Sequence, residues 1–238
     1  MPAPPSVSPS KAEAVRTMFT RIARRYDLMN SLMTGGRHHA WRRKVAESAA
    51  GAPAGPLLDL ATGTAVLAIA ARVRTPGRFV AGADFSEGML RIGQAKLRER
   101  RVGRVQLLAA DALVLPFRDR AFACVMSAFL LRNLESLERG LAEMRRVTMP
   151  GGRVVTLDIV RPAQPVWGAL FGAYFNHVVP AIGAVVAGDW QAYTYLPQSV
   201  DRFVTPDELV ELMETVGLRD VTYRRFGLGT IALHVGIA

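Results

Sequence analysis

The sequence contains a single cysteine, Cys124, among its 238 residues. One thiol excludes an internal disulfide and a metal site built from cysteines, and this scarcity is compatible with a reducing compartment. Cys124 lies inside the apolar segment 121–126, so we interpret it as a small buried hydrophobic residue. We expect no metal ion in this protein.

The N-terminus lacks the features of a targeting segment. Residues 1–13 carry prolines at positions 2, 4, 5 and 9 and no apolar core, a pattern typical of neither a signal peptide nor a membrane anchor. We expect residues 1–13 to form a disordered tail. The remaining length suits one α/β domain with an appendage and is short for two complete domains.

Acidic residues are scarce, because 20 Asp and Glu stand against 30 Lys and Arg, a formal net charge of +10. Residues 1–51 hold nine basic and three acidic residues, so nine minus three places +6 of this charge in about a fifth of the chain. Such a region suits a polyanion, either nucleic acid or an anionic membrane surface. The sequence has no nucleic-acid-binding module, so we expect a membrane contact and no nucleic acid. A solvated basic face is the alternative.

Alternating apolar and amphipathic segments predict a doubly wound α/β sheet. A linker at 51–56 separates an N-terminal helical lid, 14–55, from the main domain, 56–238. Pro150-Gly151-Gly152 is expected to turn the chain into the fifth strand. The expected strands are 57–61, 78–83, 104–109, 121–127, 153–159, 219–225 and 230–236, and the expected helices are 14–23, 40–46, 65–73, 87–100, one near 115–120, 135–147 and 206–216.

The first expected strand leads into a loop with one glycine where a dinucleotide site needs three. The strand ends near Asp59, and after Gly63 the next two glycine positions of the G-x-G-x-x-G pattern carry side chains. S-adenosylmethionine has no phosphate for a bare backbone to approach, and its α-ammonium group suits the anion Asp59. Asp84, ending the next strand, is placed to accept hydrogen bonds from ribose hydroxyls. We favour S-adenosylmethionine over a nicotinamide or flavin cofactor; an ordinary turn in a cofactor-free domain is the other alternative.

One long segment, 166–187, has no formally charged residue. By length it could cross a bilayer, but Gly168, Gly172, Pro180 and Gly183 interrupt it, and it lies between two strands of one sheet. The alternatives are a buried helical lid and an apolar surface or tunnel for a hydrophobic substrate, which do not exclude one another. We treat about 163–200 as an apolar helical insertion in the main domain.

Candidate catalytic residues follow the fourth expected strand, where the acceptor enters a doubly wound methyltransferase. Arg132 and Asn133 could hold a phenolic oxygen or orient a water that removes its proton. In the alternative, Asn133 caps the next helix and Arg132 is a surface cation. His38 and His177 are rival bases, although a lone histidine near an apolar segment is more often structural.

Several blocks of the sequence resemble the C-methyltransferases of ubiquinone and menaquinone biosynthesis, over about residues 18–236. The cofactor loop and the Pro-Gly-Gly turn are shared by many methyltransferases, whereas the blocks that begin at Arg25, Leu131 and Ala187 are together specific to this family. The blocks are Arg25-Tyr26-Asp27-Leu28-Met29-Asn30, Asp59-Leu60-Ala61-Thr62-Gly63-Thr64, Asp84-Phe85-Ser86-Glu87-Gly88-Met89-Leu90, Leu115-Pro116-Phe117, Leu131-Arg132-Asn133, Pro150-Gly151-Gly152-Arg153, and Ala187-Gly188-Asp189 with Tyr193-Thr194-Tyr195-Leu196-Pro197.

The resemblance implies a class I S-adenosylmethionine-dependent methyltransferase with a doubly wound, Rossmann-like sheet. Its expected reaction is methylation of a ring carbon in a polyprenylated quinol, demethylmenaquinol or else the benzoquinol intermediate of ubiquinone synthesis. The expected enzyme is cytoplasmic and peripherally associated with the inner face of the cytoplasmic membrane, and a homodimer is left open. The alternatives are a related methyltransferase for another quinone or phenol, a nicotinamide-dependent oxidoreductase, and a degenerate fold that binds lipid or a partner.

The predicted site has three groups of residues. The catalytic group is Arg132 and Asn133, with Tyr26 from the lid, which position the quinol hydroxyl or a water that acts as base. The predicted cofactor contacts are Asp59, Ala61, Thr62, Gly63, Thr64, Asp84, Phe85, Met89, Asp111, Ala112 and Ala128. The predicted acceptor contacts are Leu130, Phe171, Phe175, Asp189, Tyr193 and Tyr195.

Two residues depart from the family's pattern. Val66 stands where the family often has an acid. Losing a carboxylate that faces the cofactor would weaken binding of the methionine end of the cofactor or leave Asp59 to bind that end. Leu130 stands where the family has a glycine. A bulkier side chain there would narrow the acceptor cleft.

Overall fold

The computed structural model is built on a seven-stranded sheet with the order β3-β2-β1-β4-β5-β7-β6, and it describes residues 11–187 and 189–238. Strands β1 to β5 are parallel, and β7 is antiparallel to both of its neighbours. The predicted doubly wound sheet is confirmed. Its strands are β1 (Leu57–Leu60), β2 (Val80–Asp84), β3 (Val105–Ala109), β4 (Phe122–Ala128), β5 (Thr148–Ile159), β6 (Arg219–Phe226) and β7 (Ile231–Ile237).

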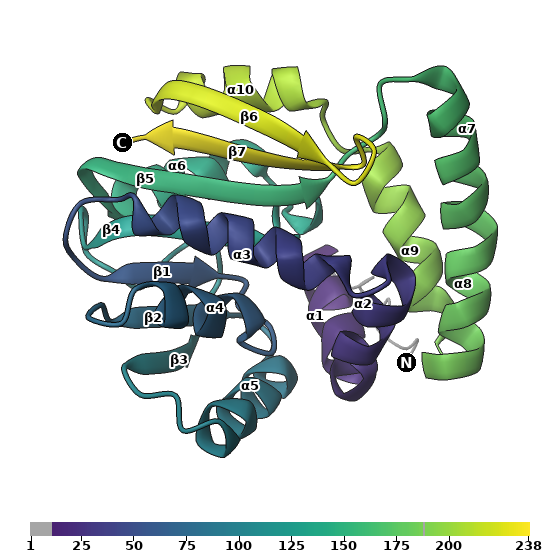
Figure 1. The fold of residues 1–238 in the computed structure, drawn as a ribbon, viewed down its shortest axis with the longest axis horizontal. Coiled ribbons are helices and arrows are strands. Elements are labelled where there is room, and N and C mark those ends of the chain that lie inside the picture. The colour runs from purple at the N-terminus through teal and green to yellow at the C-terminus, as the bar shows by residue number, and fades with distance from the viewer. Residues whose placement is uncertain (1–10, 188) are drawn as a thin grey trace, which may run out of the picture.

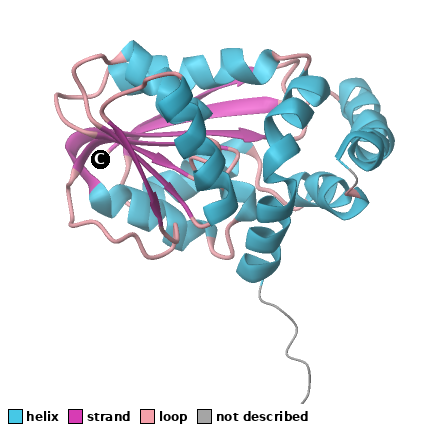
Figure 2. Cartoon of the chain, turned by 90° about the horizontal axis from the view of Figure 1, so that it is seen from below, coloured by secondary structure: helices cyan, strands magenta, loops and turns pink. Residues whose placement is uncertain are grey.

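Helices pack on both faces of the sheet (Figure 2). One face is covered by α3 (Arg37–Ala50), α4 (Val66–Arg74) and α5 (Glu87–Glu99), and the other by α6 (Leu137–Val147) and α10 (Pro206–Thr215). Because both faces are covered, the central strands are apolar on both sides. In β1, Leu57 faces the first layer, which is that of α3, α4 and α5, and Leu58 faces the second layer, which is that of α6 and α10. Cys124 is fully buried in the first layer, as predicted.

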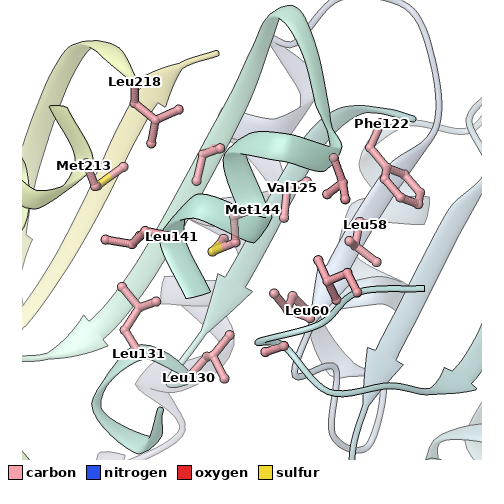
Figure 3. Close-up of a cluster of buried hydrophobic side chains, with 14 of the residues drawn as sticks. Leu58, Leu60, Phe122, Val125, Leu130, Leu131, Leu141, Met144, Met213 and Leu218 are labelled. Atoms are coloured by element: carbon pink, nitrogen blue, oxygen red, sulfur yellow. The ribbon is translucent and has the colours of Figure 1, made fainter. Parts of the chain in front are cut away.

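The second layer contains a continuous apolar cluster around α6, in which Leu141 is fully buried (Figure 3). We expect Leu141→Ala to lower the free energy of unfolding by about 2–5 kcal/mol, because it removes buried methyl groups and leaves a cavity. Leu228, an exposed leucine, is the matched control: its replacement by alanine is expected to change stability by about 0.5 kcal/mol or less. Urea denaturation of both variants tests this, and equal losses would contradict it.

The helix predicted near 115–120 is wrong, because this segment is a loop. Arg146, on α6, donates hydrogen bonds to the carbonyl oxygens of Leu115 and Phe117 at 3.0 and 2.8 Å. The N–H of Leu115 donates to Glu143 at 2.7 Å. The carbonyl oxygen of Leu115, which a helix would pair with the N–H of Asp119, is thus taken by Arg146, and tertiary contacts override the local pattern.

Two predicted boundaries also move. Ser136, not Asn133, caps α6, because the Ser136 hydroxyl accepts a hydrogen bond from the N–H of Arg139 at 3.2 Å. Strand β5 begins at Thr148, five residues before its predicted start, and the Pro-Gly-Gly turn forms an irregularity inside the strand. Gly151 has φ +73° there, in the left-handed region that glycine tolerates.

The lid consists of α1 (Lys11–Ile22), a 3₁₀ turn η1 (Ala23–Arg25), α2 (Tyr26–Thr34) and α3. Helix α1 begins three residues before its predicted start, α3 extends beyond the predicted 40–46 at both ends, and α2 occupies a segment where no helix was predicted. Of the predicted disordered tail, residues 11–13 instead form the first turn of α1, and residues 1–10 lie outside the described residues.

The insertion consists of α7 (Pro165–Ala173), π-helical turns η3 (Tyr174–Val178) and η4 (Gly183–Ala187), and the helices α8 (Val179–Ile182) and α9 (Trp190–Asp201). It packs with the lid beyond the carboxyl ends of the parallel strands, at the right of Figure 1. The Tyr174 hydroxyl donates to the carbonyl oxygen of Met33 at 2.9 Å. Arg21 pairs with Asp189, and Arg25 donates to the carbonyl oxygen of Val186 at 2.7 Å. The lid and the insertion therefore form one cover over the strand ends.

Candidate active site

Three adjoining cavities lie where this cover meets the carboxyl ends of the strands. The largest, about 440 Å³, lies between the lid and the insertion and is called the lid cavity. The strand-end cavity lies over the ends of β1, β2 and β4, and the Asp59 cavity lies beneath the loop after β1. Tyr26 lines all three, and Phe19, Phe129 and Asn133 line both the lid and strand-end cavities. The cavities are thus contiguous.

The structure brings all of the predicted cofactor residues together. Those in the strand-end cavity are Ala61, Gly63, Asp84, Phe85, Met89, Asp111, Ala112 and Ala128. Those in the Asp59 cavity are Asp59, Ala61, Thr62, Gly63, Thr64 and Ala128. Their roles toward the cofactor remain predictions.

The loop after β1 is held against β2. The N–H of Gly63 donates to Asp84 Oδ2 at 2.8 Å, and the other carboxylate oxygen of Asp84 accepts from the N–H of Ser86 at 2.8 Å. Ala61 and Ala65 have φ of 57° and 63°, a left-handed backbone that costs a residue with a Cβ about 1–2 kcal/mol. Strain of this kind gathers at functional sites.

Asp59 is almost fully buried at the end of β1. Its Oδ2 accepts a hydrogen bond from the Thr62 hydroxyl at 2.7 Å, and its Oδ1 has no hydrogen-bond partner among the described residues. Burial raises the pKa of Asp59 to about 7, while the Thr62 hydrogen bond opposes this shift. A buried carboxylate with one free oxygen can accept a cationic donor.

Arg132 and Asn133 lie in a 3₁₀ turn, η2 (Leu131–Asn133), directly after β4. The alternative of a surface cation is wrong for Arg132, since its side chain is only 6% exposed and pairs with Asp158 at 2.5 Å. Asn133 donates from Nδ2 to the carbonyl oxygen of Phe129 at 2.9 Å, and its buried Oδ1 has no partner among the described residues. Both side chains line the lid cavity beside Tyr26.

Four of the predicted acceptor residues, Phe171, Phe175, Tyr193 and Tyr195, line the lid cavity. Leu130, the residue before η2, instead lines the strand-end cavity. Asp189 lines none of the three cavities. It caps α9 by accepting from the N–H of Ala192 at 3.0 Å and pairs with Arg21, so the structure places it in the contact between cover segments.

Two charged residues of this region were missed by the sequence reasoning. Asp158, near the end of β5, is 2% exposed and holds Arg132. Arg42, on α3, lines the Asp59 cavity and is also buried. The sequence pattern that could have identified Arg42 as buried is its position on the helix. It shares a face with the buried residues Val45, Ala46 and Ala49, whereas Arg43 and Lys44 are exposed.

Residues 7–238 match the model of the ubiE/COQ5 methyltransferase family. The chain belongs to this family. It is 42% identical over 219 residues to the demethylmenaquinone methyltransferase of Thermus thermophilus, covering 92% of this chain and 99% of the relative. It is 41% identical over 228 residues to the ubiquinone/menaquinone biosynthesis C-methyltransferase UbiE of Desulfotalea psychrophila, covering 96% and 92%.

Solved structures agree on the fold of this ubiE/COQ5 family member. A SAM-dependent methyltransferase from Aquifex aeolicus superposes with a TM-score of 0.64 at 16% identity, over 89% of this chain and 98% of that one. One from Thermotoga maritima, described as a possible histamine N-methyltransferase, gives 0.65 at 17% identity, over 93% and 98%. The predicted class I methyltransferase fold is confirmed.

S-adenosylmethionine is the cofactor that this family and fold imply, and the residues present fit it. The free, buried oxygen of Asp59 suits an α-ammonium group, and the strand-end cavity offers the apolar Phe85 and Met89 beside the carboxylates of Asp84 and Asp111. The loop has no run of bare glycines for a pyrophosphate. The nicotinamide alternative therefore loses its support.

The two histidines considered as bases, His38 and His177, are poorly suited to that role, although His38 lines the lid cavity. Burial lowers the pKa of His38 to about 3, with Arg42 adding to the shift. Its Nδ1 faces the Arg42 guanidinium, which only donates, so the ring proton is on Nε2, facing Ser31 Oγ at 3.1 Å. His177 is exposed and lines none of the three cavities.

Proposed function

We propose that this chain transfers a methyl group from S-adenosylmethionine to a ring carbon of a polyprenylated quinol, demethylmenaquinol first. The observation that carries the proposal is the lid cavity, which is large, mainly apolar, and contiguous with the predicted cofactor residues at Tyr26 and Asn133. A relative named demethylmenaquinone methyltransferase shares 42% of its residues with this chain. Both observations favour a hydrophobic acceptor with a ring at the cofactor end.

Polar side chains line the lid cavity at several points, including the lid helices, and one group of them lies where η2 meets α9. Arg132, Asn133 and Tyr195 lie near one another there, and Oδ1 of Asn133 and the hydroxyl of Tyr195 are buried without partners among the described residues. Burial raises the pKa of Tyr195, so its phenol stays protonated and can donate. Buried polar groups are rarely left unpaired without a reason. We assign this group to the quinol oxygens and the wall at Phe171 and Phe175 to the prenyl tail.

When bound, S-adenosylmethionine supplies an electrophilic methyl group. Asn133 Oδ1 accepts a hydrogen bond from the quinol hydroxyl or from the water that takes its proton. The Arg132 guanidinium donates to the oxygen as negative charge develops, while Asp158 fixes its orientation. The electron density moves onto the adjacent ring carbon, which would bond to the methyl carbon as the sulfur–methyl bond breaks and S-adenosylhomocysteine leaves as a neutral thioether. The ring carbon then loses its own hydrogen as a proton. Tyr26 holds the ring toward the cofactor residues.

The acceptor assignment predicts a dependence on the tail. We expect kcat/KM to be about tenfold or more higher for demethylmenaquinol with one isoprene unit than for the ring without a tail, because the tail buries apolar surface in the lid cavity. The measurement is a steady-state assay under reducing conditions, with a prenylated benzoquinol and a simple phenol as competing acceptors. A preference for the phenol would favour the alternative that this chain is a related methyltransferase acting on another quinone or phenol. Equal rates with and without the tail would contradict the assignment.

We further propose that the insertion contacts an anionic membrane from the cytoplasmic side. Among the described residues, one helical stretch, Val166–Val186, is long and apolar enough to cross a membrane by length and composition, with mean hydropathy 1.5. Its buried side, including Phe175 and Val179, packs on the lid. Its other side is exposed and largely apolar, interrupted by the exposed polar pair Asn176 and His177, while Arg25 at its end adds a basic group. A helix with one face on protein and one exposed apolar face suits the membrane interface better than a span. Oligomeric state, including a homodimer, stays a prediction.

Exposed valines offer a matched test of this contact. Val185, on the insertion, is 86% exposed, and Val73, on α4, is 71% exposed. We expect Val185→Glu to reduce binding to phosphatidylglycerol-containing vesicles several-fold, because a carboxylate opposes both insertion and an anionic surface. Val73→Glu is expected to bind like the wild type in the same flotation assay. Equal binding by all three proteins would contradict the contact.

A further inference from the structure

The Asp59 cavity carries one negative and one positive side chain. Its lining residues are Tyr26, Arg42, Asp59, Ala61, Thr62, Gly63, Thr64, Val66, Leu67 and Ala128, of which Asp59 and Arg42 are the ionisable pair of opposite charge. No ion pair joins these two among the described residues. Asp59 Oδ2 accepts from the Thr62 hydroxyl, and Oδ1 has no partner there. The cavity therefore separates a buried carboxylate from a buried guanidinium.

Arg42 is fixed in this position from two sides. Its Nη1 donates to His38 Nδ1, one helical turn earlier on α3, and its guanidinium lies over the Phe129 ring at 5.1 Å from the centroid. A guanidinium has five N–H donors, and the His38 contact uses one nitrogen. The rest of the fork is available to the cavity that Arg42 lines.

Neighbouring charges are already compensated. Asp27, on the lid, accepts from Lys96 at 2.6 Å and from the Thr64 hydroxyl at 2.8 Å. Val66, which stands where an acid is expected from the resemblance, lines the cavity without charge. The balance of one carboxylate and one guanidinium matches a ligand that is itself a zwitterion.

We propose that Arg42 of α3 is the clamp for the carboxylate of the methyl donor, whose α-amino-acid end lies where the small Asp59 cavity, about 20 Å³, adjoins the strand-end cavity. The ammonium group faces Asp59, and the Arg42 fork donates to the carboxylate oxygens. This inference rests on the proposed function only for the identity of the donor.

The test compares two ligands that differ only in the carboxylate. S-adenosylhomocysteine and its decarboxylated analogue are titrated by calorimetry into the wild type, Arg42→Gln, Arg42→Lys and Arg43→Gln. We expect the wild type to prefer S-adenosylhomocysteine by about 10-fold to 100-fold, the range for hydrogen bonds between charged groups. Arg42→Gln is expected to lose most of this preference while binding the decarboxylated analogue within about twofold of wild type.

Arg43→Gln is the matched control, because Arg43 is the exposed neighbour on the same helix and its loss removes the same charge. It is expected to retain the full preference, and Arg42→Lys to retain part of it. The proposal is overturned if Arg42→Gln weakens both ligands equally, or if the wild type itself binds both alike, a result that needs no variant to fold. Failure of the wild type to bind either ligand would overturn the methyl donor as well, which separates the two claims.

Discussion

Replacing Asn133 by alanine is expected to lower kcat by about a hundredfold to a thousandfold, while the affinity for S-adenosylhomocysteine stays within about twofold of wild type. Its Oδ1 is buried without a partner among the described residues, so the variant removes the acceptor for the quinol hydroxyl or the base water. The same loss is expected for Arg132→Met, which removes the cation beside the developing oxyanion. Stopped assays of methyl transfer give kcat, and calorimetry gives the affinity.

Arg132→Met also leaves Asp158 buried without its partner, which costs about 3–5 kcal/mol of stability. The Asn133 variant avoids this effect, so its kcat carries the test, with thermal melting as the check on folding. Arg139→Met, which removes an exposed arginine of α6, is the control and is expected to have wild-type kcat. If both site variants, folded, kept rates within a fewfold of wild type, the assignment would be wrong.

Asp59→Asn is expected to weaken S-adenosylhomocysteine binding about a hundredfold and to abolish its pH dependence. In the free protein burial raises the pKa of Asp59 to about 7, and the cofactor's ammonium group binds only the carboxylate form. Below pH 7 the carboxyl group must therefore release a proton on binding, so Kd rises by up to about tenfold per pH unit of acidification. Above pH 7 the carboxylate is already present and Kd becomes flat.

Calorimetric titrations between pH 5 and 8 in buffers of different ionisation enthalpy measure both Kd and the proton release. Asp201→Asn, at the exposed end of α9, is the control and is expected to follow the wild-type profile. A wild-type Kd that does not change across this pH range would contradict the assignment of the ammonium group to Asp59.

The cofactor side of the site could be predicted because its residues are local to the strand ends. Asp59 is the penultimate residue of β1, Gly63 lies in the loop after it and Asp84 ends β2, and the carboxyl ends of parallel strands meet at one edge of the sheet. Strand positions, a single loop and one acid per strand are thus enough to bring these residues together. The structure does so through the hydrogen bond from Gly63 to Asp84.

Features set by long-range contacts could not be predicted. Arg146 pairs with carbonyl oxygens of the loop before β4 and prevents a helix there, and Asp189 reaches Arg21 across most of the chain length. In the basic run from Arg42 to Lys44, helical phase places Arg42 on the buried face, but the packing of α3 on the sheet is what brings its side chain to the Asp59 cavity. Side-chain chemistry alone is identical for Arg42 and Arg43.

The acceptor side lies between these cases. The apolar insertion was recognisable from composition, and Phe171, Phe175, Tyr193 and Tyr195 do line the lid cavity. Leu130 does not: it lines only the strand-end cavity, whereas its neighbours Phe129 and Asn133 line both. The expected narrowing of the acceptor cleft by Leu130 therefore finds no support in the geometry, and its bulk falls beside the cofactor residues.

Transfer of a labelled methyl group to a quinol ring carbon tests the central claim most directly. The protein is incubated anaerobically with S-adenosylmethionine carrying a deuterated methyl group and with reduced, prenylated demethylmenaquinone. Mass spectrometry then measures incorporation, and NMR locates the label. The account predicts a menaquinol with one intact deuterated methyl group on the ring carbon. A label on oxygen, or no transfer by a folded protein that binds S-adenosylhomocysteine, would contradict it.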